Sequence, residues 1–335
     1  MTGRPLVLSL IIMIAFTSSG CDKPSSFKRS RLIMDTIVNI KVSEPSSLLQ
    51  KKAVAMAFDE MEELEKVLSK YDEASEVALI NRMHKEESLP LGRDTAFLLS
   101  KALDLYSLTE GAFDVTVSEL VDLWNDSKRA STLPSSEEIE EARTLVGSGY
   151  LRLDVDGTLT LKREGVKLDL SGIAKGYAVD RAVAVLKDSG IESGIVDAGG
   201  DIYCFGPGPR GKEWRVGVRN PRDDSLIGAL SLRDAAVATS GDYYRFFIIG
   251  EKRYSHIIDP RTGSPVSETP MSVTVIAPDC LTADAMATAI TVMGPSIGLD
   301  FAENQREIEA IIISKDGDGF KVELTSGAKA LYEEL

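Results

Sequence analysis

The spacing of hydrophobic residues changes along this chain from a helical period to a strand period. In the first half, one stripe at helical spacing consists of Val54, Ala57, Met61, Leu64 and Leu68. Residues with this spacing lie on one face of a helix, so they predict a long helix that starts at 45–47. Similar reasoning predicts helices at 94–109 and 134–145, the second capped by Ser135 or Ser136.

The second half contains short apolar runs separated by turn residues. One strand is expected already at 32–42, and further strands are expected at 191–205, 214–218, 227–232, 243–249, 271–277, 308–314 and 320–324. Helices are expected between them at 173–189 and 281–293. Many hairpin-like strands with a few long helices indicate an α+β fold with largely antiparallel sheets. A doubly wound Rossmann fold is disfavoured, because no G-x-G-x-x-G follows a first strand.

The N-terminus carries an apolar run, at 6–16, that is too short to cross a membrane. Small residues follow it and lead to Cys21. This order is typical of a signal peptide at 1–20 and resembles a bacterial lipobox, so we expect a lipid anchor on Cys21. Residues 21–31 then form a tether, and 32–335 form one globular domain. Ordinary secretion with a chance cysteine is the alternative.

Composition narrows the function classes. The chain has 335 residues, and 38 basic against 52 acidic residues give a net charge of −14. No basic stripe is present, so nucleic acid is not an expected partner. An acidic protein that binds an anionic substrate needs local cations, and a divalent metal would supply them. Beyond Cys21, only Cys204 and Cys280 remain, and these can pair or stay as buried thiols.

The segment 169–201 is the most informative part of the chain. It opens with Asp169 at a tight turn around Gly172, continues as a helix, and returns as a strand that breaks at 199–200. Small residues at a helix start let backbone groups approach a phosphate or a metal. This segment alone is compatible with many nucleotide-binding enzymes.

A second candidate site lies on the helix expected at 281–293. Asp284 and Thr288 are four residues apart, so their oxygens lie on one helical face. A carboxylate with a hydroxyl offers the hard oxygen ligands that Mg²⁺ prefers. In the alternative interpretation, Asp284 caps the helix and Thr288 bonds back to a carbonyl of the preceding turn.

Histidine is scarce, which limits the choice of a general base. His84 lies in a polar loop and is expected to be solvated. His256 lies where a strand end meets a Pro/Gly turn. It can face a cleft as a base at neutral pH, or it can be a hydrogen-bonded structural residue.

Together, the motifs resemble the FAD:protein FMN transferase family, the ApbE-type flavin transferases. The resemblance covers the chain after Leu32, and the motifs follow in family order at 34–36, 71–81, 111–114, 169–180, 198–201, 240–243, 256–263 and 284–288. Four positions depart from the pattern: Asp35 and Ser171 replace glycine, Val115 replaces proline, and Asp197 replaces asparagine. Because Asp35 stands where the family has glycine, the sequence does not determine the backbone conformation at this position.

The resemblance implies a T-fold-like architecture of two closely packed lobes, with FAD between them and Mg²⁺ at its pyrophosphate. The implied metal ligands are the Gly172 carbonyl, Asp284 and Thr288. The implied cofactor-binding residues are Met34, Tyr71, Ala112, Phe113, Asp114, Asp169, Lys175 and Ile258. His256 and Asp284 are the candidate catalytic residues. Without the motifs, core packing would be the better explanation of Tyr71 and Phe113 taken singly.

The same resemblance implies the reaction and its partners. A Thr or Ser hydroxyl of a target protein would take the FMN part of FAD, and AMP would leave. The targets would be subunits of membrane redox complexes of the Rnf or Nqr type, reached from the periplasmic face of the inner membrane, where the lipid-anchored chain is expected. Two alternatives remain: an Mg²⁺-dependent FAD pyrophosphatase that yields FMN and AMP, and a non-catalytic FAD carrier.

Overall fold

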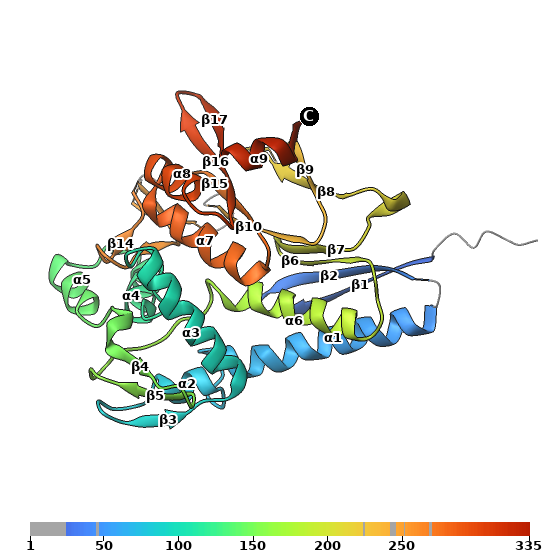
Figure 1. The fold of residues 1–335 in the computed structure, drawn as a ribbon. Helices are drawn as coiled ribbons and strands as arrows, with labels where there is room; N and C mark the ends of the chain where they lie inside the picture. Colours follow the sequence, from blue (N-terminus) through green and yellow to red (C-terminus); the bar gives the residue numbers. More distant parts are fainter. Residues whose placement is uncertain (1–24, 45–46, 224, 242–245, 251, 268–269) are drawn as a thin grey trace, which may run out of the picture.

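An eight-stranded sheet forms the centre of the molecule (Figure 1). The structure is a computed structural model, and it describes residues 25–44, 47–223, 225–241, 246–250, 252–267 and 270–335. In spatial order the strands are β1 (Ser25–Ile33), β2 (Thr36–Glu44), β6 (Gly194–Ala198), β7 (Asp201–Phe205), β10 (Ala235–Gly241), β15 (Ser272–Ala277), β16 (Glu309–Asp316) and β17 (Gly319–Leu324). Every neighbouring pair is antiparallel.

Three long helices pack on one face of this sheet and bury the main core. They are α1 (Ser47–Leu68), α6 (Ala174–Asp188) and α7 (Cys280–Met293). Their apolar stripes meet the inward residues of the central strands, which include Val38, Val196 and Val275. The other helices are α2 (Glu76–Ile80), α3 (Arg93–Leu108), α4 (Ser118–Ala130), α5 (Ser136–Arg143), α8 (Pro295–Glu303) and α9 (Ser326–Leu331), with short 3₁₀ turns at Ser148–Tyr150 and Pro209–Gly211.

A smaller sheet packs on the opposite face. Its strand order is β18 (Tyr332–Glu334), β9 (Leu226–Leu232) and β8 (Trp214–Arg219). Val216 and Leu230 of this sheet pack against Val237 and Ile311 of the main sheet in a second core. Three further small sheets complete the fold: β3 (Ser88–Pro90) with β5 (Thr158–Leu161) and β4 (Leu151–Leu153), β11 (Phe246–Ile249) with β12 (Lys252–Ser255), and β13 (Ile258–Asp259) with β14 (Ser264–Pro265).

The predicted α+β class with antiparallel sheets is confirmed, and the predicted helices are present. The helix expected at 134–145 is α5, which Ser135 caps through a bond accepted from the Glu138 N–H at 3.2 Å. Cys204 and Cys280 are buried free thiols, so the unpaired alternative holds. Within the described ranges, no helix combines the length and apolarity needed to span a bilayer. The signal peptide and Cys21 lie outside the described residues.

Two predictions about the N-terminal strand were wrong. Residues 25–31 do not form a tether, because β1 starts at Ser25 and pairs with β2 along its length. The single strand expected at 32–42 is interrupted by a hairpin turn at Met34 and Asp35, which have φ values of 52° and 55°. Residues before the turn end β1, and residues after it belong to β2. A two-residue hairpin loop with positive φ at both positions fits the strand twist, and aspartate tolerates this region better than most residues.

The prediction of a second single strand was also wrong, because this segment forms a hairpin. The run at 191–205 divides into β6 and β7, because Gly199 and Gly200 turn the chain with φ values of 67° and 105°. This turn brings Asp201 back beside Ala198, at the end of the sheet that borders α6.

Helices α6 and α7 approach each other so closely that only glycine fits at their contact. A Cβ atom on Gly176 would overlap the carbonyl oxygen of Cys280 and lie 2.9 Å from Cβ of Asp284. One turn along α6, Asp180 accepts hydrogen bonds from the N–H groups of Cys280 and Leu281, at 2.8 and 2.9 Å. These contacts fix the start of α7 against α6.

Replacing Gly176 with alanine should therefore destabilise the protein. Overpacking of this kind costs about 1–3 kcal/mol, and the obstructing atom is backbone, which yields little. The free energy of unfolding would be measured by urea denaturation. Gly149→Ala is the control, because a Cβ there meets nothing within 4 Å, and its effect should stay below about 0.5 kcal/mol. Equal stability of the two variants would contradict the packing argument.

Candidate functional site

The predicted site residues line two adjoining cavities. The larger cavity, about 870 Å³, lies at one end of α6 and α7 and extends between the two sheets. The smaller cavity, about 580 Å³, lies beside the β1–β2 turn and α4. The two share six lining residues: Val121, Asp169, Ser171, Lys175, His256 and Ile258.

Every predicted site residue that the structure describes lines at least one of these cavities. The larger cavity is lined by Ala112, Phe113, Asp114, Asp169, Gly172, Lys175, His256, Ile258, Asp284 and Thr288. Met34 and Tyr71 line the smaller cavity. Residues from six separate segments of the sequence therefore converge on one region, and the fold brings together the candidate metal, cofactor and catalytic groups.

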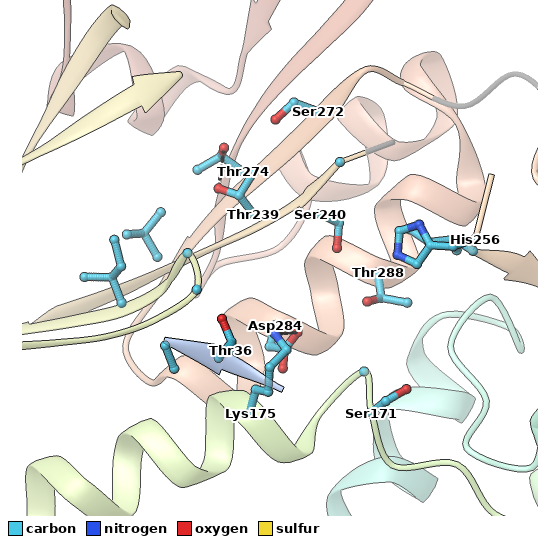
Figure 2. Close-up of a pocket in the computed structure, with 18 of the residues that line it drawn as sticks. Thr36, Ser171, Lys175, Thr239, Ser240, His256, Ser272, Thr274, Asp284 and Thr288 are labelled. Atoms are coloured by element: carbon cyan, nitrogen blue, oxygen red, sulfur yellow. Dashed lines mark hydrogen bonds and ion pairs between the residues drawn. The ribbon is translucent and has the colours of Figure 1, made fainter. Parts of the chain in front are cut away.

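The candidate metal ligands lie close together. Figure 2 shows Asp284 and Thr288 on successive turns of α7. A Cβ atom on Gly172 would lie 3.6 Å from the Thr288 hydroxyl oxygen, so the 172 backbone faces this hydroxyl directly. The capping interpretation of Asp284 is wrong, because Asp279 is the N-cap and accepts from the Thr282 N–H at 2.8 Å.

The donor set fits Mg²⁺. One oxygen of Asp284 accepts from the Gly176 N–H at 3.1 Å, which leaves its other oxygen for a cation. A carboxylate, a hydroxyl and a backbone carbonyl are hard oxygen ligands, and Mg²⁺ takes few protein ligands when phosphates supply others. No cluster of three or more His, Cys, Asp or Glu suited to a metal occurs among the described residues.

Lys175 lies between two carboxylates at the base of the larger cavity. Its ammonium group hydrogen-bonds to Asp201. The same group lies 4.0 Å from Oδ1 of Asp284, and Figure 2 shows these two side chains together. Burial lowers the pKa of Lys175, but the charges of Asp284 and Asp201 outweigh it, so the net shift is upward and the group stays protonated. Burial and the charge of Asp284 raise the pKa of Asp201. Sequence reasoning missed Asp201 as a site residue, although it ends the 198–201 motif.

Asp169 is held by a lysine that sequence reasoning also missed. One oxygen of Asp169 accepts from the Ser171 N–H at 2.9 Å, and the other lies 3.1 Å from Nζ of Lys70. Lys70 also contacts Asp122 at 2.9 Å and lies 5.3 Å from the ring centre of Tyr71. Lys70 immediately precedes Tyr71, the first residue of the 71–81 motif, and this position was the available signal.

Two aromatic predictions have different outcomes. Tyr71 is 75% exposed, so core packing does not explain it, and its ring stands at the smaller cavity. Phe113 is 4% exposed and belongs to the main core while also lining the larger cavity. It therefore serves packing whether or not a ligand touches it.

The side chain of Asp114 is already engaged by the protein. It accepts four hydrogen bonds, from the N–H and hydroxyl groups of Thr116 and of Ser148. Burial raises the pKa of Asp114, and these hydrogen bonds act in the opposite direction. Three of these bonds go to Oδ1 and one goes to Oδ2, so the protein itself uses most of the roughly four acceptor positions of this carboxylate. Asp114 thus shapes the loop that carries Ala112 and Phe113.

The two histidines differ in position. His256 is exposed and lines both cavities, in the segment between β12 and β13. It therefore stands where the two cavities adjoin. His84 is also exposed, and its Nδ1 lies 2.8 Å from Glu164, consistent with a solvated surface residue.

Comparison with known proteins gives a consistent result. A model of the ApbE family matches residues 34–312. The chain is 35% identical to the FAD:protein FMN transferase of Vibrio cholerae, in an alignment that covers 97% of each protein. The solved flavin transferase ApbE from Vibrio cholerae has a TM-score of 0.83 at 34% identity, covering 92% of this chain and all of that one. The ApbE protein from Thermotoga maritima has a TM-score of 0.84 at 36% identity, with the same coverage.

The buried acid Asp180 predicts a pH dependence of stability. Burial raises its pKa to about 7 from an ordinary value of 3.8, and backbone hydrogen bonds from Cys280 and Leu281 offset part of this. The folded state then binds this proton more tightly than the unfolded chain. The contribution to stability is complete below the unfolded pKa and is lost as the pH rises through the folded pKa.

Asp180→Asn should therefore reduce the loss of stability between pH 4 and pH 7. The free energy of unfolding would be measured by urea denaturation across this range, with EDTA present. Asp188→Asn, at the exposed end of the same helix, should keep the wild-type slope. An unchanged slope in Asp180→Asn would mean that this carboxyl does not carry the effect.

Proposed function

This chain belongs to the ApbE family, and on that premise we propose that it is a flavin transferase that moves the FMN part of FAD onto a target protein. The acceptor is a Thr or Ser hydroxyl, the leaving group is AMP, and Mg²⁺ is required. The observation that carries the proposal is the convergence of Gly172, Asp284 and Thr288 in the cavity that also holds Lys175.

The reaction exchanges one phosphorus–oxygen bond for another. The hydroxyl oxygen of the acceptor bonds to the FMN-side phosphorus, the bond from that phosphorus to the bridging oxygen breaks, and AMP leaves with that oxygen. With Mg²⁺ held by the Gly172 carbonyl, Asp284 and Thr288, charge on the non-bridging phosphate oxygens would be neutralised as it develops.

The chain's own residues orient the reactants and handle the proton. Lys175, which stays protonated between Asp201 and Asp284, supplies a fixed positive charge beside the diphosphate. His256 lines both cavities and can accept the hydroxyl proton at neutral pH. Tyr71 offers an exposed aromatic face to the flavin ring at the smaller cavity.

The location proposed for this activity is the cell envelope. A lipid anchor on Cys21 would hold the chain at the periplasmic face of the inner membrane, beside acceptor subunits of membrane redox complexes. This part of the proposal rests on the 6–21 sequence pattern alone.

The direct test is incubation of the mature chain with FAD, Mg²⁺ and a peptide that carries the family's S/T-G-A-S/T acceptor pattern. We expect the peptide to gain the mass of FMN, with AMP released in equal amount. Free FMN and AMP with an unmodified peptide would instead establish the FAD pyrophosphatase. FAD recovered intact would leave only the carrier.

The metal site predicts a difference between two threonines of α7. Thr288 lines the larger cavity, whereas the Thr291 hydroxyl donates to the Ala287 carbonyl oxygen at 2.7 Å and does not line it. Thr288→Ala should lower turnover and raise the Mg²⁺ concentration needed for half activity by about 10–100-fold, by analogy with lost metal-site contacts. Asp284→Ala should abolish turnover.

Thr291→Ala serves as the matched control, with the same chemical change on the same helix. It should keep the wild-type Mg²⁺ requirement. Equal Mg²⁺ requirements in the two threonine variants, or activity retained by Asp284→Ala, would show that the metal binds elsewhere.

A further inference from the structure

One end of the larger cavity is lined by strands and contains none of the predicted cofactor or metal residues. We call this end the strand-lined lobe, formed by residues of β2, β6, β7, β10 and β15 on one side and of β8 and β9 on the other. The predicted residues lie on α6, α7 and the loops at the opposite end. The lobe is therefore a part of the cavity to which the predicted cofactor-binding and metal-binding residues assign no ligand.

The edge of β8 borders this lobe. Four consecutive residues, 216–219, line the cavity. Successive side chains of a strand point to opposite faces, and Val216 and Val218 point into the second core. A cavity that Gly217 also lines therefore runs along the edge of the strand. β8 is the outer strand of its sheet, and among the described residues it pairs on one side only, with β9. Between Trp214 and Val218, such an edge presents backbone N–H and C=O groups that can pair with a further strand.

The facing side of the lobe carries small polar groups. Thr239 and Thr274 form a cross-strand hydroxyl pair at 2.9 Å, with Ser240 and Ser272 nearby on the same two strands (Figure 2). A Cβ atom on Gly200 would meet nothing within 4 Å, so this part of the lobe is open. A polypeptide with small side chains fits between these two sides of the lobe. Its backbone can hydrogen-bond to the hydroxyl groups on one side and to the strand edge on the other.

The lobe is continuous with the reactive region. Ser240 and Val218 line the same cavity as Thr288 and His256. A segment seated along β8 therefore reaches the proposed phosphate position without leaving the cavity.

We propose that the acceptor segment of the target protein binds in this lobe as an added β-strand along the free edge of β8. The inference rests on the proposed transferase function and assigns the site of its protein substrate. Main-chain hydrogen bonds supply most of the affinity, so targets of differing sequence are accepted. Small residues around the hydroxyl are required because the lobe lies between two sheets.

Hydrogen exchange followed by mass spectrometry tests the assignment. The mature chain with FAD and Mg²⁺ would be compared with and without an acceptor peptide whose reactive hydroxyl residue is replaced by alanine, so that the complex persists. Added peptide should slow exchange in Trp214–Arg219. Protection of this strand by FAD and Mg²⁺ alone, with no further change on adding peptide, would assign the lobe to the cofactor and overturn the proposal.

Backbone N-methylation of the reactive peptide gives a second, independent readout. Because alternate residues of an added strand donate to the edge, N-methyl groups should raise KM for the peptide at every second position. Uniform tolerance, with transfer still observed, would overturn the docking mode while the transferase function stands. Absence of transfer to any peptide, with β8 still protected, would overturn the function and retain the binding site.

A matched pair of variants on β2 probes the lobe from the protein side. Asn39 lines the lobe, and Lys41, two residues along the same strand, does not. Asn39→Trp should raise KM for the peptide about tenfold with FAD affinity unchanged, and Lys41→Trp should leave both at wild-type values. Equal KM values for the two variants would contradict the assignment.

Discussion

The contact between α6 and α7 is the constraint on which the candidate site depends. Gly176 lets the two helices meet at the Cys280 carbonyl, and Asp180 holds the first N–H groups of α7. This contact sets the positions of Asp284 on one helix and Lys175 on the other. A side chain at the contact would separate the helices and with them the carboxylate and the ammonium group.

Charge balance follows from the same arrangement. Asp201 and Asp284 surround one lysine in a chain that already carries a charge of −14. One ammonium group beside two carboxylates provides no excess of positive charge, so these three side chains alone would not neutralise a diphosphate. The acidic composition and the oxygen donors on α7 both support the proposal that a divalent cation binds here.

The sequence allowed the fold class and most helices to be predicted, because their signals are local. The period of 54–68 identifies α1, and the Ser135 cap identifies α5. The β1–β2 turn was missed because Met34 and Asp35 lack the glycine that usually marks positive φ.

The ion pairs within the site were harder to predict. Lys70 meets Asp169 only after α1 and the 169 turn have been placed by the fold. The family motifs nevertheless located the cavity residues, since most of them mark a chain reversal or a helix start near the cavities, and Asp284 and Thr288 lie on the part of α7 that lines the larger cavity. Motifs identify which residues converge on the site, but they do not show which neighbouring side chain binds each of them. The hydrogen bond from Lys175 to Asp201 is an example.

If the chain is lipid-anchored as proposed, the early start of β1 would limit where the enzyme can work. With the proposed anchor on Cys21, only Asp22, Lys23 and Pro24 separate the lipid from the first residue of the sheet at Ser25. Four chain steps span at most about 14 Å when fully extended. The catalytic domain would then be confined to a thin layer above the bilayer, and only acceptor hydroxyls presented within that layer would be modified. Selection of targets would thus depend on height above the membrane as well as on sequence.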